Sequence, residues 1–436
     1  MQVVIDALNW ICGLGPMCMM PIIMFVIGIC LRVKIGTLLK CCITTGVGFC
    51  GVNLVINTFV AQVGPSVQNM VTRFGLHTDI MDVGWPARAA ATWAYPLAAV
   101  VVFVVLGINI LMLVLKATNC VMVDFWSYNH FIFCAAICYY ASGSAIIGLI
   151  CGAICAIVTF KLADWTQPVV EEEFGLPGVS FPTSNSISWA PLAYLLNKVY
   201  DHIPGLNKLQ ADPESIQKKF GVLGEPLMIG TILGAVFGIL GGNDVAGVMT
   251  VAMYTAATMV LTPKMMQVLM EGLIPFADAV KELLNKKFSG NKFHIGIDAA
   301  LTIANPSCIA VGILMVPTTI ILAMVLPFNR LLPISDIAYQ AMWLSAYPVA
   351  FSKGNVVRSY ISCVIFTIIM LFIATSLAPV HTALAVAGGY DLAGAALVST
   401  EDAGTHLLSY LLSVVAGLFH YAIPLTNFKI VQRAVL

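Results

Sequence analysis

The stretch TSNSISWAPLAYLL (residues 183–196) aligns with STEDAGTHLLSYLL (residues 399–412). Each stretch follows an apolar flank, turns polar through Ser, Thr, Asn, Asp or Glu, and returns to an apolar helical pattern. The two segments lie at the ends of the two halves of the chain. Interrupted segments at matching places in two halves are typical of transporters, where they meet near the membrane midplane and bind substrate. The pair therefore predicts two hairpin tips that form a transport site.

The rest of the chain is unusually apolar. Of its 436 residues, 60% are hydrophobic and 10% are charged, and the mean hydropathy is +0.94. A soluble domain is about half apolar and about a quarter charged, so this composition excludes a soluble enzyme and indicates a polytopic, all-α membrane protein. Lys+Arg and Asp+Glu are equal at 21 each, so no nucleic acid or other polyanionic partner is expected.

Charge-free runs give the expected number of membrane spans. A spanning helix needs about 20 apolar residues. Runs of about this length or more cover residues 7–31, 41–72, 89–115, 125–160, 245–263, 299–329, 359–390 and 403–428, with shorter ones at 226–243 and 337–352. The 125–160 run contains Ser142-Gly143-Ser144, which predicts a turn between two helices. We expect about ten or eleven transmembrane helices.

Lysine and arginine are distributed unevenly between the polar loops. They are frequent in residues 198–219 and 263–295, whereas residues 61–91 contain only Arg73 and Arg88. An excess of these residues marks the cytoplasmic side of a membrane protein. We therefore expect 198–219 and 263–295 in the cytoplasm and 61–91 outside.

Sparse identities extend the match between the halves beyond the tips. Pro16, Gly28 and Pro65 recur 210 positions later as Pro226, Gly238 and Pro275, and Gly143 recurs as Gly354. The loops after the second span of each half also have opposite expected sides. These observations predict an inverted repeat, with repeat one at about 7–200, a cytoplasmic connector at about 201–221 and repeat two at about 222–428.

Polar side chains within or beside the apolar runs are candidates for the substrate site, because such residues are costly in a membrane unless they serve a function. They are Asp82, Trp85, Asn129, His130, Thr183, Ser184, Asn185, Asp298, Asn305, Glu401 and Asp402. For the Ser and Thr side chains, helix capping is an alternative explanation. For His130 it is packing in the protein core. Asp298 and Asn305 are seven residues apart and share a helix face if that stretch is helical.

The available side chains indicate the ligand class. Carboxylates, amides, hydroxyls and the Trp85, Trp126 and Trp189 indoles suit a neutral polyhydroxy compound, and no Arg or Lys is prominent near the tips. An anionic substrate is therefore not expected. His381, His406 and His420 look peripheral by spacing. No metal or other cofactor is expected, because the 13 cysteines form no CxxC pair and lie mostly in apolar runs. The first 31 residues lack the basic start of a signal peptide.

Several motifs resemble the galactitol-type membrane component (enzyme IIC, or EIIC) of the bacterial sugar phosphotransferase system (PTS), in the ascorbate–galactitol superfamily. They are DVGWP (82–86) with Thr92-Trp93, Asp124-x-Trp126 with Asn129-His130, KLADW (161–165), IPGLNKL (203–209), QKKFGVLGEP (217–226), IGIDAAL (295–301), KGNVVRS (353–359) and the tip at Asp402. The resemblance covers nearly the whole chain.

The resemblance implies a multi-pass permease of the bacterial inner membrane and a homodimer. Each protomer would have a V-shaped scaffold, built from the first two helices of each repeat, and a core that moves against it as an elevator. The implied substrate is a sugar alcohol, phosphorylated by a phosphocysteine on a separate EIIB subunit that EIIA serves. Phosphoryl donor chemistry would then reside in EIIB rather than in this chain.

One position departs from the family pattern. The first tip of the family typically reads Pro-His, whereas this chain has Pro182-Thr183. A threonine can bind a hydroxyl but cannot replace histidine as a base, which leaves His130, Asp298, Glu401 and Asp402 as candidates, and His130 as the catalytic candidate. The alternative function is an ion- or proton-coupled transporter of a neutral polyol or sugar, with carboxylates as the coupling groups.

Overall fold

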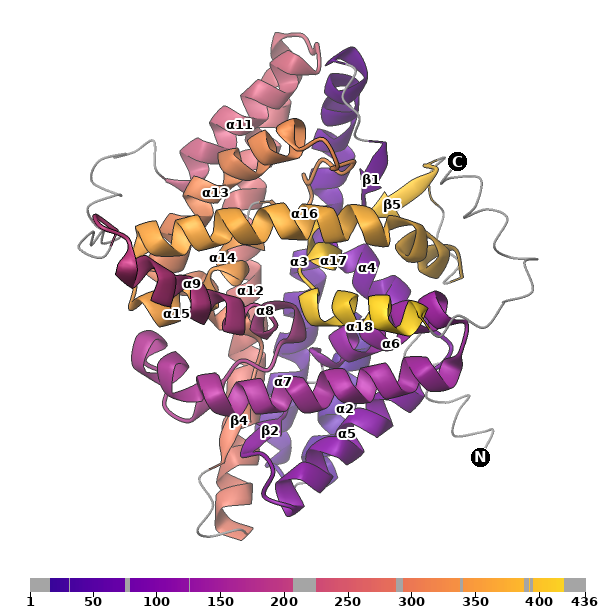
Figure 1. The fold of residues 1–436 in the computed structure, drawn as a ribbon, viewed down its shortest axis with the longest axis vertical. Helices are drawn as coiled ribbons and strands as arrows, with labels where there is room; N and C mark the ends of the chain where they lie inside the picture. Colours follow the sequence, from indigo (N-terminus) through magenta and orange to yellow (C-terminus); the bar gives the residue numbers. More distant parts are fainter. Residues whose placement is uncertain are drawn as a thin grey trace.

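A computed structural model describes residues 16–418 except 31, 75–78, 125, 207–224, 288–292, 338–339, 388–391 and 393–394. The described chain is mostly helical (Figure 1). The helices of the first half are α2 (Pro16–Cys30), α3 (Ile35–Phe74), α4 (Gly84–Trp93), α5 (Ala98–Val114), α6 (Tyr128–Ser142), α7 (Ala145–Phe174), α8 (Ser184–Ile187) and α9 (Ala190–His202). Most of the expected connector, residues 207–221, lies outside the described residues.

The second half repeats this style of long helices separated by short ones. Its helices are α11 (Pro226–Leu240), α12 (Val245–Lys287), the 3₁₀ helix η2 (Ala299–Ala304), α13 (Pro306–Val325), α14 (Gln340–Leu344), α15 (Ala346–Ser352), α16 (Val356–Ala387), α17 (Glu401–Gly404) and α18 (Leu407–Gly417). The strands of the whole chain are β1 (Ile80–Asp82), β2 (Cys120–Met122), β3 (Val179–Ser180), β4 (His294–Gly296) and β5 (Leu397–Ser399).

The turn expected within residues 125–160 is confirmed. Helix α6 ends at Ser142, and Gly143 follows with φ +73°, a left-handed conformation that glycine adopts without steric cost. Ser144 then caps α7, because its side chain accepts a hydrogen bond from the Ile147 amide at 3.4 Å. The long apolar run is therefore two antiparallel helices that pack against each other.

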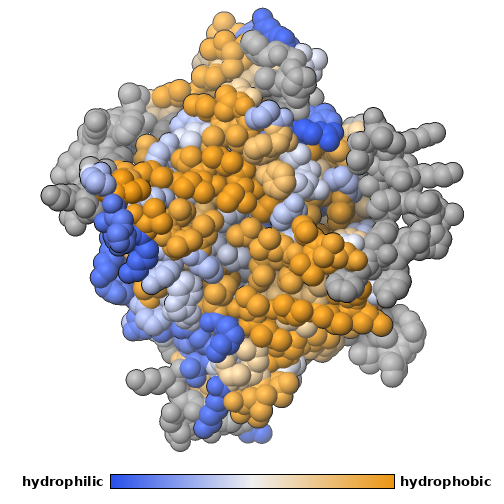
Figure 2. All heavy atoms as spheres, viewed as in Figure 1, coloured by the Kyte–Doolittle hydropathy of each residue, from blue (hydrophilic) through white to orange (hydrophobic). Residues whose placement is uncertain are grey.

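Three described helices are long and apolar enough to cross a membrane: α7, α13 and α16. The bent pair α4 and α5 adds a fourth if it is one span. Helix α7 has the two-sided pattern expected of a helix at a lipid boundary, since Ile146, Ile150 and Ile154 are exposed while Cys151 and Cys155 are buried. Apolar side chains cover much of the face in Figure 2, over α7 and α16, and hydrophilic ones gather near the end of α9. The full count of ten or eleven spans stays a prediction.

The stretch from Asp298 to Asn305 is not one α-helix, so the condition under which the two residues would share a helix face is not met. Asp298 accepts a hydrogen bond from the Ala300 amide and begins the 3₁₀ helix η2, and the chain is extended again at Asn305. Asn305 then caps α13 by accepting hydrogen bonds from the Ser307 and Cys308 amides. The break arises because proline lacks an amide hydrogen and favours the first position of a helix.

Helices α2, α3, α11 and α12 pack together as a group. Contact between α11 and α12 depends on glycines four residues apart: a Cβ added at Gly230 or Gly234 would stand 2.6 Å from the Cα of Ala256 or Ala252. Small residues at this spacing let two helix backbones approach closely in a membrane. The C-terminal ends of α3 and α12 lie at opposite ends of the long axis of the molecule (Figure 1).

Two small parallel sheets connect the halves of the chain. In one, β1 pairs with β5, and Ile80 of β1 also forms a parallel bridge to Leu331. In the other, β4 lies between β2 and β3. Each sheet thus has a central strand from one half and outer partners from the other. Because β3 leads into the first tip and β5 into the second, the sheets fix where the tips begin.

Candidate substrate site

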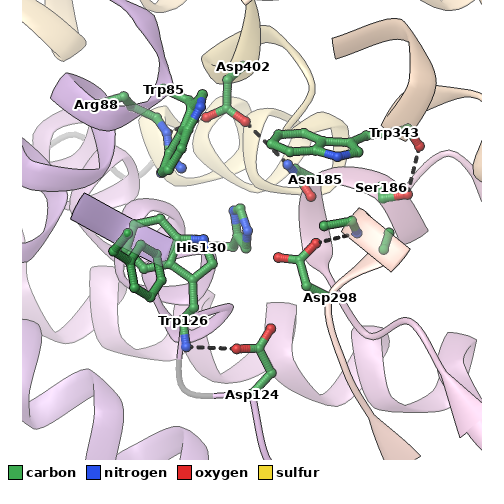
Figure 3. Close-up of a pocket in the computed structure, with 13 residues that line it drawn as sticks. Trp85, Arg88, Asp124, Trp126, His130, Asn185, Ser186, Asp298, Trp343 and Asp402 are labelled. Atoms are coloured by element: carbon green, nitrogen blue, oxygen red, sulfur yellow. Dashed lines mark hydrogen bonds and ion pairs between the residues drawn. The ribbon is translucent and has the colours of Figure 1, made fainter. Parts of the chain in front are cut away.

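A pocket lies where the two tips meet (Figure 3), with about 580 Å³ of space between its atoms, part of it open to solvent. Both halves of the chain contribute to it. Its lining residues are Phe49, Trp85, Arg88, Asp124, Trp126, His130, Asn185, Ser186, Asp298, Ala299, Ala300, Trp343 and Asp402. Five of the eleven residues expected from the sequence are among them: Trp85, His130, Asn185, Asp298 and Asp402.

The two tips contact each other directly. The Asn185 amide in α8 donates a hydrogen bond to Oδ1 of Asp402 in α17 over 3.2 Å. Trp189, just after the first tip, donates from its indole nitrogen to the Thr405 carbonyl over 2.7 Å. The second tip is itself capped by Thr400, whose hydroxyl accepts from the Asp402 amide. Residues more than 200 positions apart thus form one buried polar unit.

An arginine occupies this unit, contrary to the expectation that no cation lies near the tips. The Arg88 Nε of α4 stands 2.5 Å from Asp402 Oδ2, and both side chains are at most 2% exposed. The guanidinium also lies over the Phe133 ring, 5.2 Å from its centroid. Arg88 was missed because it was read as part of an outside loop. Its position just before an apolar run is the signal that could have identified it.

Two further carboxylates, those of Asp124 and Asp298, line the pocket, and neither forms an ion pair within the described part of the chain. Asp124 accepts hydrogen bonds from the Trp126 amide and from the Ser127 hydroxyl. Asp298 accepts from the Ala300 amide, and its carboxylate points into the pocket in Figure 3. Since the Arg88 charge is already balanced by Asp402, the pocket mainly offers oxygens that accept hydrogen bonds. Within the described ranges, no group of three His, Cys, Asp or Glu side chains could hold a metal ion.

Aromatic rings form the apolar walls of the pocket. The Trp85 and Trp126 rings are 5.4 Å apart at 79°, and Phe49 of α3 packs against Trp126 with centroids 4.9 Å apart. Trp343 lies on the other side of the pocket in Figure 3 and was not expected from the sequence. Trp189, which was expected to offer an indole face, is fully buried and does not line the pocket.

His130 lies within the pocket wall and contacts a second histidine. Its Nδ1 is 2.8 Å from Nε2 of His406, and Nδ1 of His406 is 2.9 Å from the carbonyl oxygen of Asp402. Both rings are nearly inaccessible to solvent, with exposed fractions of 3% and 0%. The expectation that His406 is peripheral is therefore wrong, because α18 packs against α6 and brings the two rings together.

Three expected site residues instead hold the surrounding loops. Asp82 accepts hydrogen bonds from the backbone amides of Gly84, Ile334 and Ser335. Thr183 accepts one from the Ala299 amide over 3.1 Å, and Asn305 caps α13 as described above. None of the three lines the pocket. Their part in substrate binding stays a prediction, and the contacts that they make support the local backbone.

The remaining three expected residues lie behind the pocket wall. Asn129 donates to the Trp126 carbonyl over 2.7 Å, and the Ser184 hydroxyl is 3.3 Å from the Cys155 sulfur. Glu401 is 2% exposed, and its Oε2 makes no hydrogen bond within the described part of the chain. None of these three residues lines the pocket, and their part in substrate binding stays a prediction.

Comparison with known proteins identifies the family. Residues 10–393 match the family model for the sugar-specific permease component of the PTS. The chain belongs to this family. The galactitol-specific EIIC components of Escherichia coli K12 and of E. coli O157:H7 are each 35% identical to it over 409 residues, which cover 94% of this chain and 90% of theirs. A putative permease IIC component of E. coli K12 is 36% identical over 387 residues, 88% of each chain.

The buried ion pair in this PTS permease predicts non-additive mutations. Asp402→Asn or Arg88→Met alone should destabilise the protein by about 3–5 kcal/mol, because each leaves one buried charge without its partner. The double variant should lose clearly less than the sum of the two. The measurement is unfolding of the purified protein in detergent, arranged as a double-mutant cycle. Additive losses would mean that the two charges do not interact.

Proposed function

We propose that this chain is the EIIC component of a phosphotransferase system for a sugar alcohol, such as galactitol. The observation that carries the proposal is the pocket itself, in which acceptor carboxylates and indole rings from both halves surround one space. Carboxylates accept hydrogen bonds from hydroxyl pairs, and aromatic faces cover the C–H surface of a polyol. Two relatives with 35% identity are named galactitol-specific, which supports the same class.

The charges of the pocket favour a neutral ligand. Arg88 is neutralised by Asp402 at 2.5 Å, so Asp124 and Asp298 set the remaining charge. An anionic substrate would have to be desolvated beside those carboxylates, which is unfavourable. A polyol brings hydroxyl donors instead. The presence of an arginine, unexpected from the sequence, therefore leaves the proposed substrate class unchanged.

The sheets support an inverted repeat as the framework of transport. In one sheet the central strand is β1, flanked by β5 and by Leu331 from the second half. In the other the central strand is β4, flanked by β2 and β3 from the first half. The two sheets are equivalent if β1 corresponds to β4 and β5 to β3. We assign repeat one to about 7–200 and repeat two to about 222–428, with about 201–221 as a cytoplasmic connector. Helices α2, α3, α11 and α12 would form the V-shaped scaffold, and the other helices would form the core.

In this arrangement Phe49 has a particular position. It comes from the scaffold helix α3, whereas the other pocket residues come from core segments. A movement of the core against the scaffold, as in an elevator, would separate Phe49 from Trp126 and open that side of the pocket. We propose this movement in a homodimer in the bacterial inner membrane. The bound polyol would then face the phosphocysteine of a separate EIIB, itself supplied by EIIA.

Uptake measurements distinguish this function from ion- or proton-coupled transport. One observation favours this alternative: Glu401 is buried, and its Oε2 has no hydrogen-bond partner among the described residues. We expect accumulation of phosphorylated galactitol that requires phosphoenolpyruvate and EIIB and that survives collapse of the proton gradient. Uptake of unmodified polyol that stops when the gradient is collapsed would refute the proposal and favour the rival.

Asp298 and Asn305 provide a matched test of the binding site. Asp298→Asn should weaken polyol binding about tenfold, because a charged hydrogen-bond acceptor is worth about 1.5 kcal/mol more than a neutral one. Asn305→Ser should keep the affinity, because residue 305 caps a helix and serine also caps. Calorimetry on both purified variants makes the comparison. Equal affinities for Asp298→Asn and the unmodified protein would remove Asp298 from the site.

The uneven charge of the loops predicts the sidedness. Cysteines introduced near residue 281, in the lysine-rich 263–295 segment, should be protected from a membrane-impermeant thiol reagent on intact cells. Cysteines introduced near residue 79, in the 61–91 segment, should be labelled. The unsubstituted protein, with its own cysteines, is the background control. Labelling of the lysine-rich segment from outside would contradict both the sidedness and the inverted repeat.

A further inference from the structure

We propose that His406 is a positioning residue that fixes the tautomer of His130, so that His130 presents a bare Nε2 to the pocket as the proton acceptor. The tautomer follows from contacts within the chain alone. Its chemical consequence, acceptance of a substrate proton, rests on the proposed function.

The tautomers of both rings follow from the Asp402 carbonyl oxygen, which has only one possible hydrogen-bonding role. The Asp402 carbonyl can only accept, so His406 Nδ1, 2.9 Å away, must carry the hydrogen and donate it. A neutral His406 then has a bare Nε2 that can only accept. His130 Nδ1, 2.8 Å from that nitrogen, must therefore be the donor. A neutral His130 with hydrogen on Nδ1 has none on Nε2.

Both rings are expected to be neutral, because each is buried and, among the described residues, no carboxylate side chain lies within hydrogen-bond distance of either ring. An isolated buried charge is costly. The opposite tautomer of His130 would place two lone pairs against each other at 2.8 Å and lose the hydrogen bond. The Phe133 ring, with its centroid 4.7 Å from that of His406, limits the space in which the His406 ring could turn away.

The ring that carries the free end of this relay borders the pocket. His130 lines the pocket, and its ring lies between Trp126 and Asp298 in Figure 3. Within the described part of the chain, the hydrogen bond of the His130 ring is the one from Nδ1 to His406, which leaves Nε2 without a hydrogen-bond partner. A hydroxyl of a bound polyol could donate to it. The relay begins at Asp402, so it is complete only when the second tip is packed against the core.

The step that this arrangement serves is phosphoryl transfer. As a substrate hydroxyl oxygen forms its bond to phosphorus, the phosphorus–sulfur bond of the EIIB phosphocysteine breaks and the sulfur leaves as a thiolate. The hydroxyl proton passes to His130 Nε2, and the imidazolium keeps donating from Nδ1 to His406. The proton leaves to solvent after the product. A base held in the correct tautomer needs no rearrangement during transfer.

Nitrogen NMR of the purified protein tests the tautomer without any activity. With ¹⁵N-labelled histidine, His130 should show a protonated Nδ1 and a bare Nε2, assigned by the signals lost in His130→Gln. In His406→Phe, which keeps a ring but removes both polar atoms, we expect His130 to move toward the Nε2–H tautomer. His381→Phe is the matched control, since His381 is equally buried and both its nitrogens lack partners in the described chain. It should leave His130 unchanged.

Polyol binding and phosphorylation by EIIB provide the second test. His406→Phe should keep polyol affinity within a few-fold and lower phosphorylation by EIIB at least tenfold, and His406→Gln should restore part of it. Glutamine qualifies because its amide can donate to the Asp402 carbonyl while its oxygen accepts from His130.

The possible results separate the tautomer, the positioning role of His406 and the proposed function. An Nε2–H tautomer of His130 in the unmodified protein, or a tautomer unchanged in His406→Phe, would overturn the proposal. Full phosphorylation by His406→Phe despite a changed tautomer would overturn the positioning role. The expected spectra without phosphoenolpyruvate-dependent uptake would leave the tautomer standing and refute the proposed function instead. If His406→Phe does not fold, the spectrum of the unmodified protein still tests the tautomer of His130. An Nε2–H tautomer of His130 in His406→Gln, whose oxygen should accept from Nδ1, would then contradict the positioning role.

Discussion

The burial of one carboxylate, that of Asp402, organises the site. A charge removed from water must be paired and hydrogen-bonded, and the Asp402 carboxylate meets this demand with groups from two separate elements, α4 and α8. Arg88 of α4 supplies the cation and Asn185 of α8 supplies an amide donor. His406 separately donates to the backbone carbonyl of Asp402, which holds the same turn. The second tip can therefore occupy its position only when α4 and the first tip occupy theirs. One electrostatic requirement thus makes the two halves of the chain depend on each other.

The two small sheets solve a second problem of the same kind. Backbone that leaves a helix inside an apolar environment loses its hydrogen bonds and needs new partners. The strands before the tips, β3 and β5, obtain them by pairing with β4 and β1 from the other half. Side chains satisfy further backbone groups, since Asp82 accepts hydrogen bonds from the amides of Ile334 and Ser335. A residue such as Asp82, which the sequence suggests as a substrate ligand, thus instead accepts hydrogen bonds from backbone amides around the pocket.

This explains what the sequence could and could not predict. Local signals were sufficient for the turn at Gly143 and for the two polar tips, because glycine, hydroxyl and carboxylate patterns act over a few residues. The partners of the tips were not accessible. His130 and His406 are 276 positions apart, and no periodicity indicates that α18 packs on α6. Arg88 was misplaced for the same reason: a single charge beside an apolar run fits a loop as well as a buried ion pair.

The charge balance of the pocket also bears on the direction of transport. Under the proposed function, a neutral polyol would enter beside Asp124 and Asp298, which line the pocket, and would donate its hydroxyl hydrogens to their oxygens. The phosphorylated product carries about −1.5 to −2 charge at neutral pH, and Arg88 is already paired with Asp402. The same carboxylates that would bind the substrate would therefore repel the product. Under the proposed function, phosphorylation both chemically traps the polyol and weakens its hold on the pocket, so the chemistry that EIIB provides would drive release as well as accumulation.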